Sequence, residues 1–141
     1  MTMVEWRVHL ASPPEQVFDA LATDAGRASF WAESAIRRGD HIDWLFPGGY
    51  SCSGEVFAED WPRVFSVGYL GGSRVTFTLS PGGADGTDVH LSDVGIADVD
   101  LTEVAPGWVS VLLALKAYVD HGVDLRNHDD GRTWDQGYCD N

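Results

Sequence analysis

One long amphipathic segment near the C-terminal end constrains the fold of this 141-residue chain more than any other feature. Its apolar residues recur at three- and four-residue steps: Val104, Trp108, Val111, Leu112, Leu115 and Val119. At about 100° per residue they fall in one narrow stripe, which predicts a helix buried along one side. Gly122 is the natural end of this helix, although the periodicity also allows an end near Leu125. The rest of the chain must supply the apolar surface that the stripe covers.

Segments of alternating apolar and polar residues predict that surface. Residues 4–10 alternate in this way, and from Ala35 to Gly95 one short strand follows another with hairpin turns between them. We expect an antiparallel meander. For the strand around Phe65 two facings stay open, with either Phe65, Val67 and Tyr69 or Val64, Ser66 and Gly68 pointing inward.

Two short helices are predicted between the first strand and the meander. Ser12 has the chemistry of an N-cap, prolines follow it, and Glu15 stands at capping-box spacing. A second helix over 25–31 is weaker because it contains Gly26. The order is therefore strand, two helices, about six strands, long helix and polar tail, which makes this an α+β chain.

Composition narrows the classes of partner. Nine basic against 22 acidic residues give a net charge of −13, and such a surface repels nucleic acid and anionic membranes. No segment has the apolar length of a membrane span, and no secretory signal is visible. Cys52 and Cys139 stand far apart without metal-ligand spacing, so we expect free thiols and a cytoplasmic protein.

Motifs that would carry catalysis or metal binding fail on inspection. Residues 49–54 resemble a nucleophile elbow, but Ser53 stands where glycine is required. The Asp-Asp-Gly run at 129–131 would place Arg126 at the first ligand position of a calcium loop, which excludes calcium. His121, His128 and Cys139 match no zinc spacing. We therefore predict no catalytic residue, no metal and no cofactor.

Acid–base catalysis would need a titratable group pointing into an apolar pocket. The strand alternation places His9, His41 and His90 on faces that we interpret as solvent-exposed. The sequence therefore favours a binding protein over an enzyme.

Several segments, in this order, resemble the AHSA-like family, named for activators of the heat-shock-protein-90 ATPase, within the START and Bet v superfamily. The matching segments are Ala11–Leu21, Phe30-Trp31, Gly54-Glu55-Val56, Pro62–Phe65, Gly86–Leu91 and Gly107–Gly122. The resemblance spans about residues 3 to 125. It implies a helix-grip fold, in which a curved antiparallel sheet of six to seven strands wraps around the C-terminal helix. We expect that domain over residues 1–125 and a polar tail over 126–141, docked through Trp134 and Tyr138 onto the domain or onto a second copy of the chain. The alternative is a free tail.

Members of this superfamily commonly hold an apolar cavity between sheet and helix, and the resemblance implies one here. The candidate lining residues are Trp31, Trp44, Phe65, Tyr69, Phe77, Trp108, Leu112 and Leu115. The alternative is that these side chains simply form a solid core.

The leading hypothesis is a non-catalytic domain that binds a small hydrophobic ligand. One alternative is a protein-interaction role, including homodimer formation through an edge strand. Chaperone activation is not carried over, because the family members with that activity have a further chaperone-binding domain. The second alternative is an enzyme of the START-type cyclase or hydrolase kind.

Overall fold

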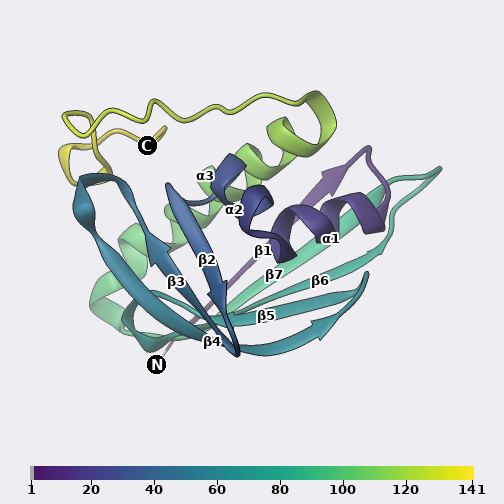
Figure 1. The fold of residues 1–141 in the computed structure, drawn as a ribbon, viewed down its shortest axis with the longest axis horizontal. Coiled ribbons are helices and arrows are strands. Elements are labelled where there is room, and N and C mark those ends of the chain that lie inside the picture. Colours follow the sequence, from purple (N-terminus) through teal and green to yellow (C-terminus); the bar gives the residue numbers. More distant parts are fainter. Residues whose placement is uncertain (1) are drawn as a thin grey trace.

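A computed structural model describes residues 2–141 and contains one seven-stranded sheet (Figure 1). The strands are β1 (Thr2–Leu10), β2 (Ser34–Arg38), β3 (His41–Leu45), β4 (Ser51–Asp60), β5 (Val64–Gly68), β6 (Arg74–Pro81) and β7 (Thr87–Ile96). They lie in the order β1-β7-β6-β5-β4-β3-β2, and every neighbouring pair is antiparallel. The predicted meander is confirmed, with β1 closing one edge beside the last strand.

The helices also follow the predicted order. They are α1 (Pro14–Ala22), α2 (Asp24–Phe30) and α3 (Leu101–His121), with short 3₁₀ turns at Pro47–Gly49 (η1), Leu70–Gly72 (η2), Asp98–Asp100 (η3) and Trp134–Gln136 (η4). α3 ends at Gly122, which has a left-handed backbone with φ of 66°. Glycine adopts this conformation without steric cost, so the first predicted helix end is correct and the extension to Leu125 is wrong.

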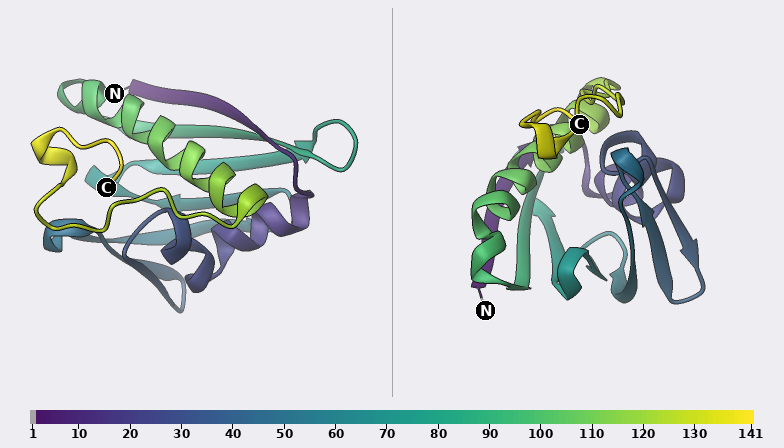
Figure 2. Two further views of the ribbon diagram at one scale, coloured as in Figure 1. Left: turned by 90° about the horizontal axis from the view of Figure 1, so that it is seen from above. Right: turned by 90° about the vertical axis from the view of Figure 1, so that its left-hand side faces the viewer.

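α3 crosses the concave side of the sheet, while α1 and α2 close one end (Figure 1). Viewed from the other sides, the sheet curves so that β1 lies beneath α3 and β2–β4 form the opposite wall (Figure 2). This α+β arrangement is the predicted helix-grip fold. Its geometry gathers the inner faces of all the central strands and one stripe of α3 into a single core.

A close glycine contact contributes to the curvature. A Cβ atom at Gly54 on β4 would lie 1.7 Å from the carbonyl oxygen of Gly68 on β5. A register shift between Val56 and Ala58 follows directly in the same pair of strands. Glycine at position 54 therefore lets the two strands approach where the sheet bends.

The start of α1 corrects one prediction. Pro13, not Ser12, occupies the N-cap position, and no side chain caps this helix. The Ser12 hydroxyl instead donates to Asp120 Oδ1 on α3 at 2.7 Å, and the backbone amides of Ala11 and Ser12 donate to the same carboxylate. These hydrogen bonds lower the pKa of Asp120 against the opposing effect of burial. The serine ties two distant segments together, so local spacing could not reveal its role.

The structure also decides the facing of β5. Phe65 and Val67 point into the core and are fully buried, and Phe65 pairs with Phe77 across β5 and β6. On the opposite face, the Ser66 hydroxyl donates to the carbonyl of Val75. The first of the two predicted facings is correct.

A buried arginine fixes α2 against β2. Arg27 is fully buried, and its guanidinium donates to the carbonyls of Leu21 and Ala35 and to Asp24 Oδ1, at 2.5 to 3.2 Å. Burial lowers its pKa, and the adjacent Asp24 carboxylate opposes that effect. The sequence analysis did not identify this residue, whose hydrogen bonds orient the end of α2.

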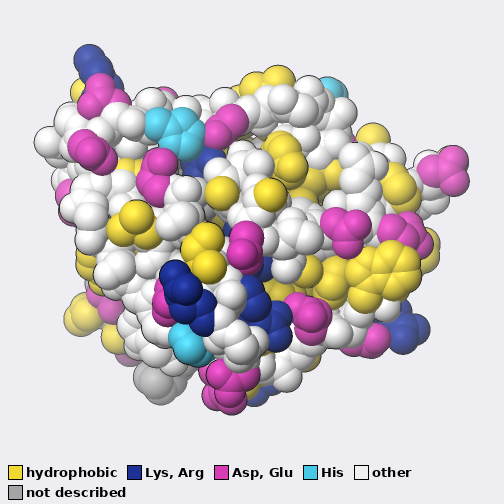
Figure 3. All heavy atoms as spheres, viewed as in Figure 1, with side chains coloured by type: hydrophobic (Ala, Val, Ile, Leu, Met, Phe, Trp, Pro, Cys, Tyr) yellow, Lys and Arg dark blue, Asp and Glu magenta, His cyan; other side chains and the backbone are white. Residues whose placement is uncertain are grey.

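Acidic side chains are scattered among hydrophobic ones on the face seen in Figure 3. Along residues 2–141, no helix combines the length and the apolar character that crossing a membrane requires. The predicted surface histidines are confirmed: His9 and His90 lie at the surface and contact Asp88 and Glu5.

Candidate functional site

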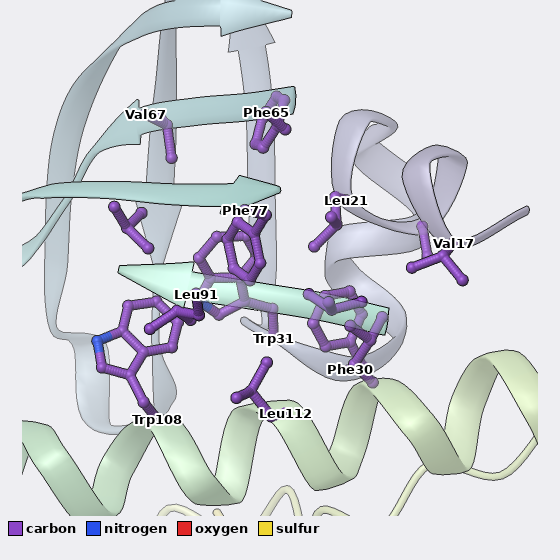
Figure 4. Close-up of a cluster of buried hydrophobic side chains, with 14 of the residues drawn as sticks. Val17, Leu21, Phe30, Trp31, Phe65, Val67, Phe77, Leu91, Trp108 and Leu112 are labelled. Carbon is purple, nitrogen blue, oxygen red and sulfur yellow. The ribbon is translucent and has the colours of Figure 1, made fainter. Parts of the chain in front are cut away.

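Trp31, directly after α2, stands at the centre of an aromatic cluster between the sheet and α3 (Figure 4). Its ring centroid lies 4.4 Å from that of Trp44, 5.3 Å from Phe77, 5.6 Å from Tyr69 and 5.7 Å from Trp108. The indole Nε1 donates to the Tyr69 hydroxyl at 3.0 Å. One side chain from the α2 end thus contacts rings from β3, β6, α3 and the β5–β6 connection.

The eight predicted cavity residues all belong to this interior, but they do not form one group. Leu112 and Leu115 are buried on α3, and Leu112 points toward Trp31 in Figure 4. Phe65 pairs with Phe77 of the cluster across β5 and β6, but its own ring packs edge-on against Phe18 of α1, with ring centroids 6.1 Å apart. Five of the eight residues form the cluster itself: Trp31, Trp44, Tyr69, Phe77 and Trp108.

Two surface hollows lie outside the cluster. One of about 390 Å³ lies between α1, α2 and the end of α3, and the other, of about 540 Å³, lies beside Trp61 and the prolines at 62 and 81. None of the eight predicted residues lines either hollow. In this structure, the Trp31 ring occupies the space between sheet and helix.

Asp93 on β7 places a carboxyl group at the edge of the aromatic cluster. The residue is buried, and its Oδ2 accepts a hydrogen bond of 2.8 Å from Trp108 Nε1. Its other oxygen, Oδ1, is buried without a hydrogen-bond partner. Burial raises the pKa of Asp93, while the Trp108 bond and the nearby Ser73 hydroxyl lower it. Loss of water disfavours the charged form of a carboxyl group, which accounts for the upward direction.

Two further buried polar atoms have no partner: Ser73 Oγ, where η2 meets β6, and Trp44 Nε1 on β3. Tyr69 contacts the indole rings of both β3 and α3: its ring centroid is 5.4 Å from that of Trp44 and 5.0 Å from that of Trp108. Burial raises the pKa of Tyr69, so its hydroxyl stays protonated. Within the described residues, Trp44 Nε1 therefore lacks a partner in the aromatic cluster itself, whereas the Ser73 and Asp93 atoms lie near each other beside it.

Asp93 is the residue that sequence reasoning missed, although a signal was present. Thr87, Val89 and Leu91 alternate along β7 on its buried face, and Asp93 continues the same alternation. An isolated aspartate matches none of the catalytic or metal-binding spacings and is not a histidine, so those motifs do not include Asp93. An acidic residue on the inner face of a strand is itself the signal, because such a residue is almost never fully buried without a partner.

The cluster reaches the surface at one side. Phe46, Cys52 and Tyr69 are partly exposed, whereas Trp44 behind them is buried. Cys52 faces the interior from β4 opposite Trp44, and burial raises the pKa of its thiol. Both cysteines are free thiols.

The segment after α3 contacts the turn that carries Trp31. Arg126 donates to the carbonyl oxygens of Ala28 and Ala32, both at 2.7 Å, and so bonds the backbone on either side of Trp31. Arg126 also pairs with Asp124. Partial burial raises the pKa of Asp124, but hydrogen bonds from Arg126 and His128 outweigh burial and lower the pKa to about 2. This arginine therefore holds the Trp31 backbone in place.

His128 lies between two carboxylates of this region. Its Nδ1 is 2.8 Å from Glu33 and its Nε2 is 2.7 Å from Asp124. The hydrogen bond with Asp124, followed by that with Glu33, raises the pKa of His128. Both interactions favour the protonated ring.

Farther along, the tail returns to the η1 turn and the first half of α3. Asp130 accepts a hydrogen bond from the amide of Gly48 at 3.2 Å, and the half-buried Trp134 lies beside Gly107. Tyr138 remains 40% exposed. Of the two aromatics expected to dock the tail, Trp134 thus has the closer contact with α3.

Solved structures similar in fold were found across several bacteria. A protein from Staphylococcus saprophyticus is 20% identical, with a TM-score of 0.75, 89% of this chain covered and 96% of that one. The Aha1 dimer from Colwellia psychrerythraea is 21% identical with the same TM-score, covering 86% of this chain and 98% of that one. DynU16, described as a putative protein in the dynemicin biosynthetic locus, is 22% identical with a TM-score of 0.71, covering 86% of this chain and 48% of that one.

Curated protein sequences provide no match to this chain. The model of the family described as "Activator of Hsp90 ATPase homolog 1-like protein" matches residues 11–120, which include both short helices, six of the strands and nearly all of α3. The predicted resemblance is therefore confirmed, and the chain belongs to the Activator of Hsp90 ATPase homolog 1-like family.

Proposed function

We propose that this protein binds a small, mainly apolar molecule between the sheet and α3, without transforming it. The proposed site consists of the aromatic cluster around Trp31, with Leu112 and Leu115 of α3 behind it. Aromatic and aliphatic walls with a few fixed polar groups are typical of small-molecule sites in proteins.

One observation carries the proposal: among the described residues, Trp44 Nε1 in the aromatic cluster, and Asp93 Oδ1 and Ser73 Oγ near each other beside it, are buried without well-formed hydrogen bonds. Leaving a buried polar group unpaired costs about 1–3 kcal/mol of folding free energy, more when it is charged. A core built only for stability would have apolar groups at these positions. Bound ligand or water supplies the missing hydrogen bonds, and the surrounding rings favour a ligand with an apolar body.

Ligand entry requires the Trp31 ring to move, because that ring fills the space in this structure. Trp31 is the C-cap residue of α2, where the regular helix has ended. A change of its rotamer would vacate a space about the size of an indole and free the Tyr69 hydroxyl. The proposed site is thus closed by its own central side chain when no ligand is present.

An environment-sensitive apolar dye tests this function. The dye should bind the native protein at one site and be displaced by small aromatic molecules. Leu112→Trp should fill the space and abolish binding. Leu113→Trp is the matched control, because Leu113 is adjacent on α3 but 51% exposed, and it should bind the dye like the unmodified protein. Dye binding confined to partly unfolded samples, or equal loss in both variants, would contradict the proposal.

A second candidate function, acid–base catalysis, has one observation in its favour. Asp93 is a buried carboxyl group with a raised pKa beside Tyr69, a combination that acid–base enzymes use. A bound molecule recovered chemically changed, with loss of the change in Asp93→Asn, would favour this candidate over simple binding.

Association of two copies of the chain is a further proposal, supported by the Colwellia psychrerythraea relative that was solved as a dimer. Native mass spectrometry of the purified protein separates the two proposals. A retained small-molecule adduct supports ligand binding, whereas a mass of two chains supports dimer formation.

A further inference from the structure

We propose that two copies of this chain associate by pairing their β1 strands antiparallel, with Trp6 of each copy at the two-fold axis. This inference rests on the association proposed above, because it names the surface through which two copies meet. It follows from the state of the two sheet edges and from the order of charges along β1.

The sheet has two edges, β1 and β2, and side chains of α2 close the β2 edge. The carbonyl of Ala35 on β2 accepts hydrogen bonds of 3.0 and 3.2 Å from the guanidinium of Arg27. The amide of Arg37, also on β2, donates to Asp24 Oδ1 at 3.0 Å. A further strand would have to displace these partners, so β2 is protected against strand addition.

The β1 strand forms the other margin of the sheet (Figure 2). The carbonyl of His9 accepts a hydrogen bond from Lys116 of α3, so the backbone of His9 points away from β7. Alternate residues of a paired strand direct their backbone groups to the same side, so Met3, Glu5 and Arg7 also point outward. Within residues 2–141, no hydrogen bond occupies the outward N–H and C=O groups of these three residues. This part of β1 is therefore a free edge that ends at Lys116.

The side chains along the free edge favour one register. With the axis at Trp6, Glu5 of each copy lies opposite Arg7 of the other, and Val4 lies opposite Val8. An axis at Glu5 or at Arg7 would instead place two like charges opposite each other. Opposite charges stabilise a cross-strand pair and like charges destabilise it. Because Glu5 and Arg7 both point outward, each such pair also exchanges two backbone hydrogen bonds.

The fold leaves the required side chains available. Arg7 is exposed and has no ion pair among residues 2–141, whereas Glu5 shares only a surface contact of 3.1 Å with His90. Trp6 is 42% exposed, and its Nε1 donates to the carbonyl of Ala105 at 3.0 Å. In the paired strands the two Trp6 rings would cover part of each other's exposed surface. The charge of −13 on each copy opposes their approach, so salt that screens it should strengthen the dimer.

Charge exchange tests the pairing, with dissociation constants measured by sedimentation velocity in about 0.15 M salt. Glu5→Arg and Arg7→Glu each place like charges opposite one another twice, so each should weaken self-association about tenfold. An equimolar mixture of the two variants should regain the dimer, because every pair then joins opposite charges. Arg38→Glu is the matched control: Arg38 is exposed on β2, the net charge equals that of Arg7→Glu, and self-association should stay unchanged.

Disulfide cross-linking tests the position of the axis independently of charge. In a Cys52→Ala, Cys139→Ala background, Trp6→Cys should give a covalent dimer under mild oxidation, because residues on the axis face each other at a Cα distance of about 4.5 Å. Glu5→Cys is the control. The two copies of that position are offset by two residues along the strands, so it should stay monomeric under the same oxidation.

The outcomes separate this surface from the association itself. If the unmodified protein is monomeric even at about 1 mM, both the association and its surface are overturned. If a dimer forms but Glu5→Arg and Arg7→Glu leave its dissociation constant unchanged, the association stands and the β1 pairing is overturned. The same holds if Glu5→Cys cross-links as readily as Trp6→Cys. Weakened single variants, a restored mixture and cross-linking confined to Trp6→Cys would together support the pairing.

Discussion

Arg27 and Asp93 are both charged residues in the interior, yet their surroundings are opposite. Arg27 donates to two backbone carbonyls and one carboxylate, so its buried charge is fully partnered. Asp93 has one hydrogen bond, from Trp108, and a second oxygen with no partner. The first arrangement stabilises the junction of α2 and β2, whereas the second leaves bonding capacity unused. The contrast separates a buried charge that serves the fold from one that, under the proposed function, a ligand would partner.

Arg27→Met should produce the largest effect on stability. The substitution keeps the apolar stem but leaves the carbonyls of Leu21 and Ala35 buried without a donor. Each buried carbonyl left unpaired costs about 1–3 kcal/mol, so we expect the two together to lower the free energy of unfolding by about 2–6 kcal/mol, measured by urea unfolding. Arg38→Met is the control, because Arg38 is exposed and pairs only with Asp43, and it should cost less than about 1 kcal/mol. Equal losses of unfolding free energy in the two variants would show that the buried Arg27 contributes no more to stability than a surface ion pair.

Trp108→Ala should also destabilise the fold strongly, by about 3–5 kcal/mol for a large aromatic side chain removed from a core. Trp108 is buried, and its Nε1 donates to Asp93 Oδ2. Trp61→Ala, at a position 56% exposed, should change the unfolding midpoint little. Combined with Asp93→Asn, Trp108→Ala should show a coupling of more than about 0.5 kcal/mol, since the two residues share a hydrogen bond. A loss below 1 kcal/mol for Trp108→Ala alone would contradict the burial of this helix face.

Asp93→Asn should be tolerated, and its effect should depend on pH. The pKa of Asp93 is raised on folding, so the protonated carboxyl favours the folded state below the ordinary value of 3.8, and that contribution is lost as pH rises through the folded-state pKa. The Asn variant lacks this loss, so its stability relative to the unmodified protein should increase with pH over that range. Thermal unfolding at a series of pH values measures the difference. Strong destabilisation of Asp93→Asn at neutral pH would place Asp93 with Arg27 as a residue that serves the fold.

Removing residues 126–141 should have a smaller effect on stability and a clear effect on ligand entry. The deletion removes the Arg126 bonds to the carbonyls of Ala28 and Ala32, which hold the backbone on either side of Trp31. We propose that the tail docks on the domain, so its loss should lower the melting midpoint and speed the binding of the apolar dye. Arg126→Ala should reproduce most of the rate change. An unchanged midpoint together with an unchanged binding rate would show that the tail does not restrain Trp31.

The smallest expected effect concerns pH and the tail. The pKa of His128 is raised by Asp124 and Glu33, so its ion pairs stabilise the docked tail below the unfolded value of 6.5 and weaken as pH rises through the folded-state value. Arg126 opposes this shift. A spin label on the exposed Cys139, in a Cys52→Ala background, should become more mobile across that range. His128→Asn should remove the pH dependence, and unchanged label mobility from pH 5 to 9 in the parent protein would contradict it.

The fold was largely predictable because its signals are local. The stripe from Val104 to Val119, the alternating strands and the Gly122 helix end each depend on neighbouring residues, and each is confirmed. The capping prediction at Ser12 was wrong because its hydroxyl bonds Asp120, which is more than a hundred residues away. Local spacing does not specify long-range partners of this kind.

The candidate site was predictable only in its apolar part. Bulky residues on inward faces pointed to the interior, and the structure buries Trp31, Trp44 and Trp108 there. The roles of Asp93 and Arg27 could not be predicted in the same way, because apolar periodicity predicts where apolar side chains are buried and does not identify the partners of a charged residue. What each one does depends on how many of its hydrogen bonds the rest of the fold completes.

The indole of Trp31 lies 4.4 Å from that of Trp44 and 5.7 Å from that of Trp108. At such separations the excited states of the three chromophores couple, which gives a paired positive and negative band in circular dichroism and rapid energy migration among them. Turning Trp31 away would break this coupling at once. If ligand binding turns Trp31 as proposed above, the loss of this coupling is an intrinsic optical signal that stopped-flow spectroscopy would follow without any label.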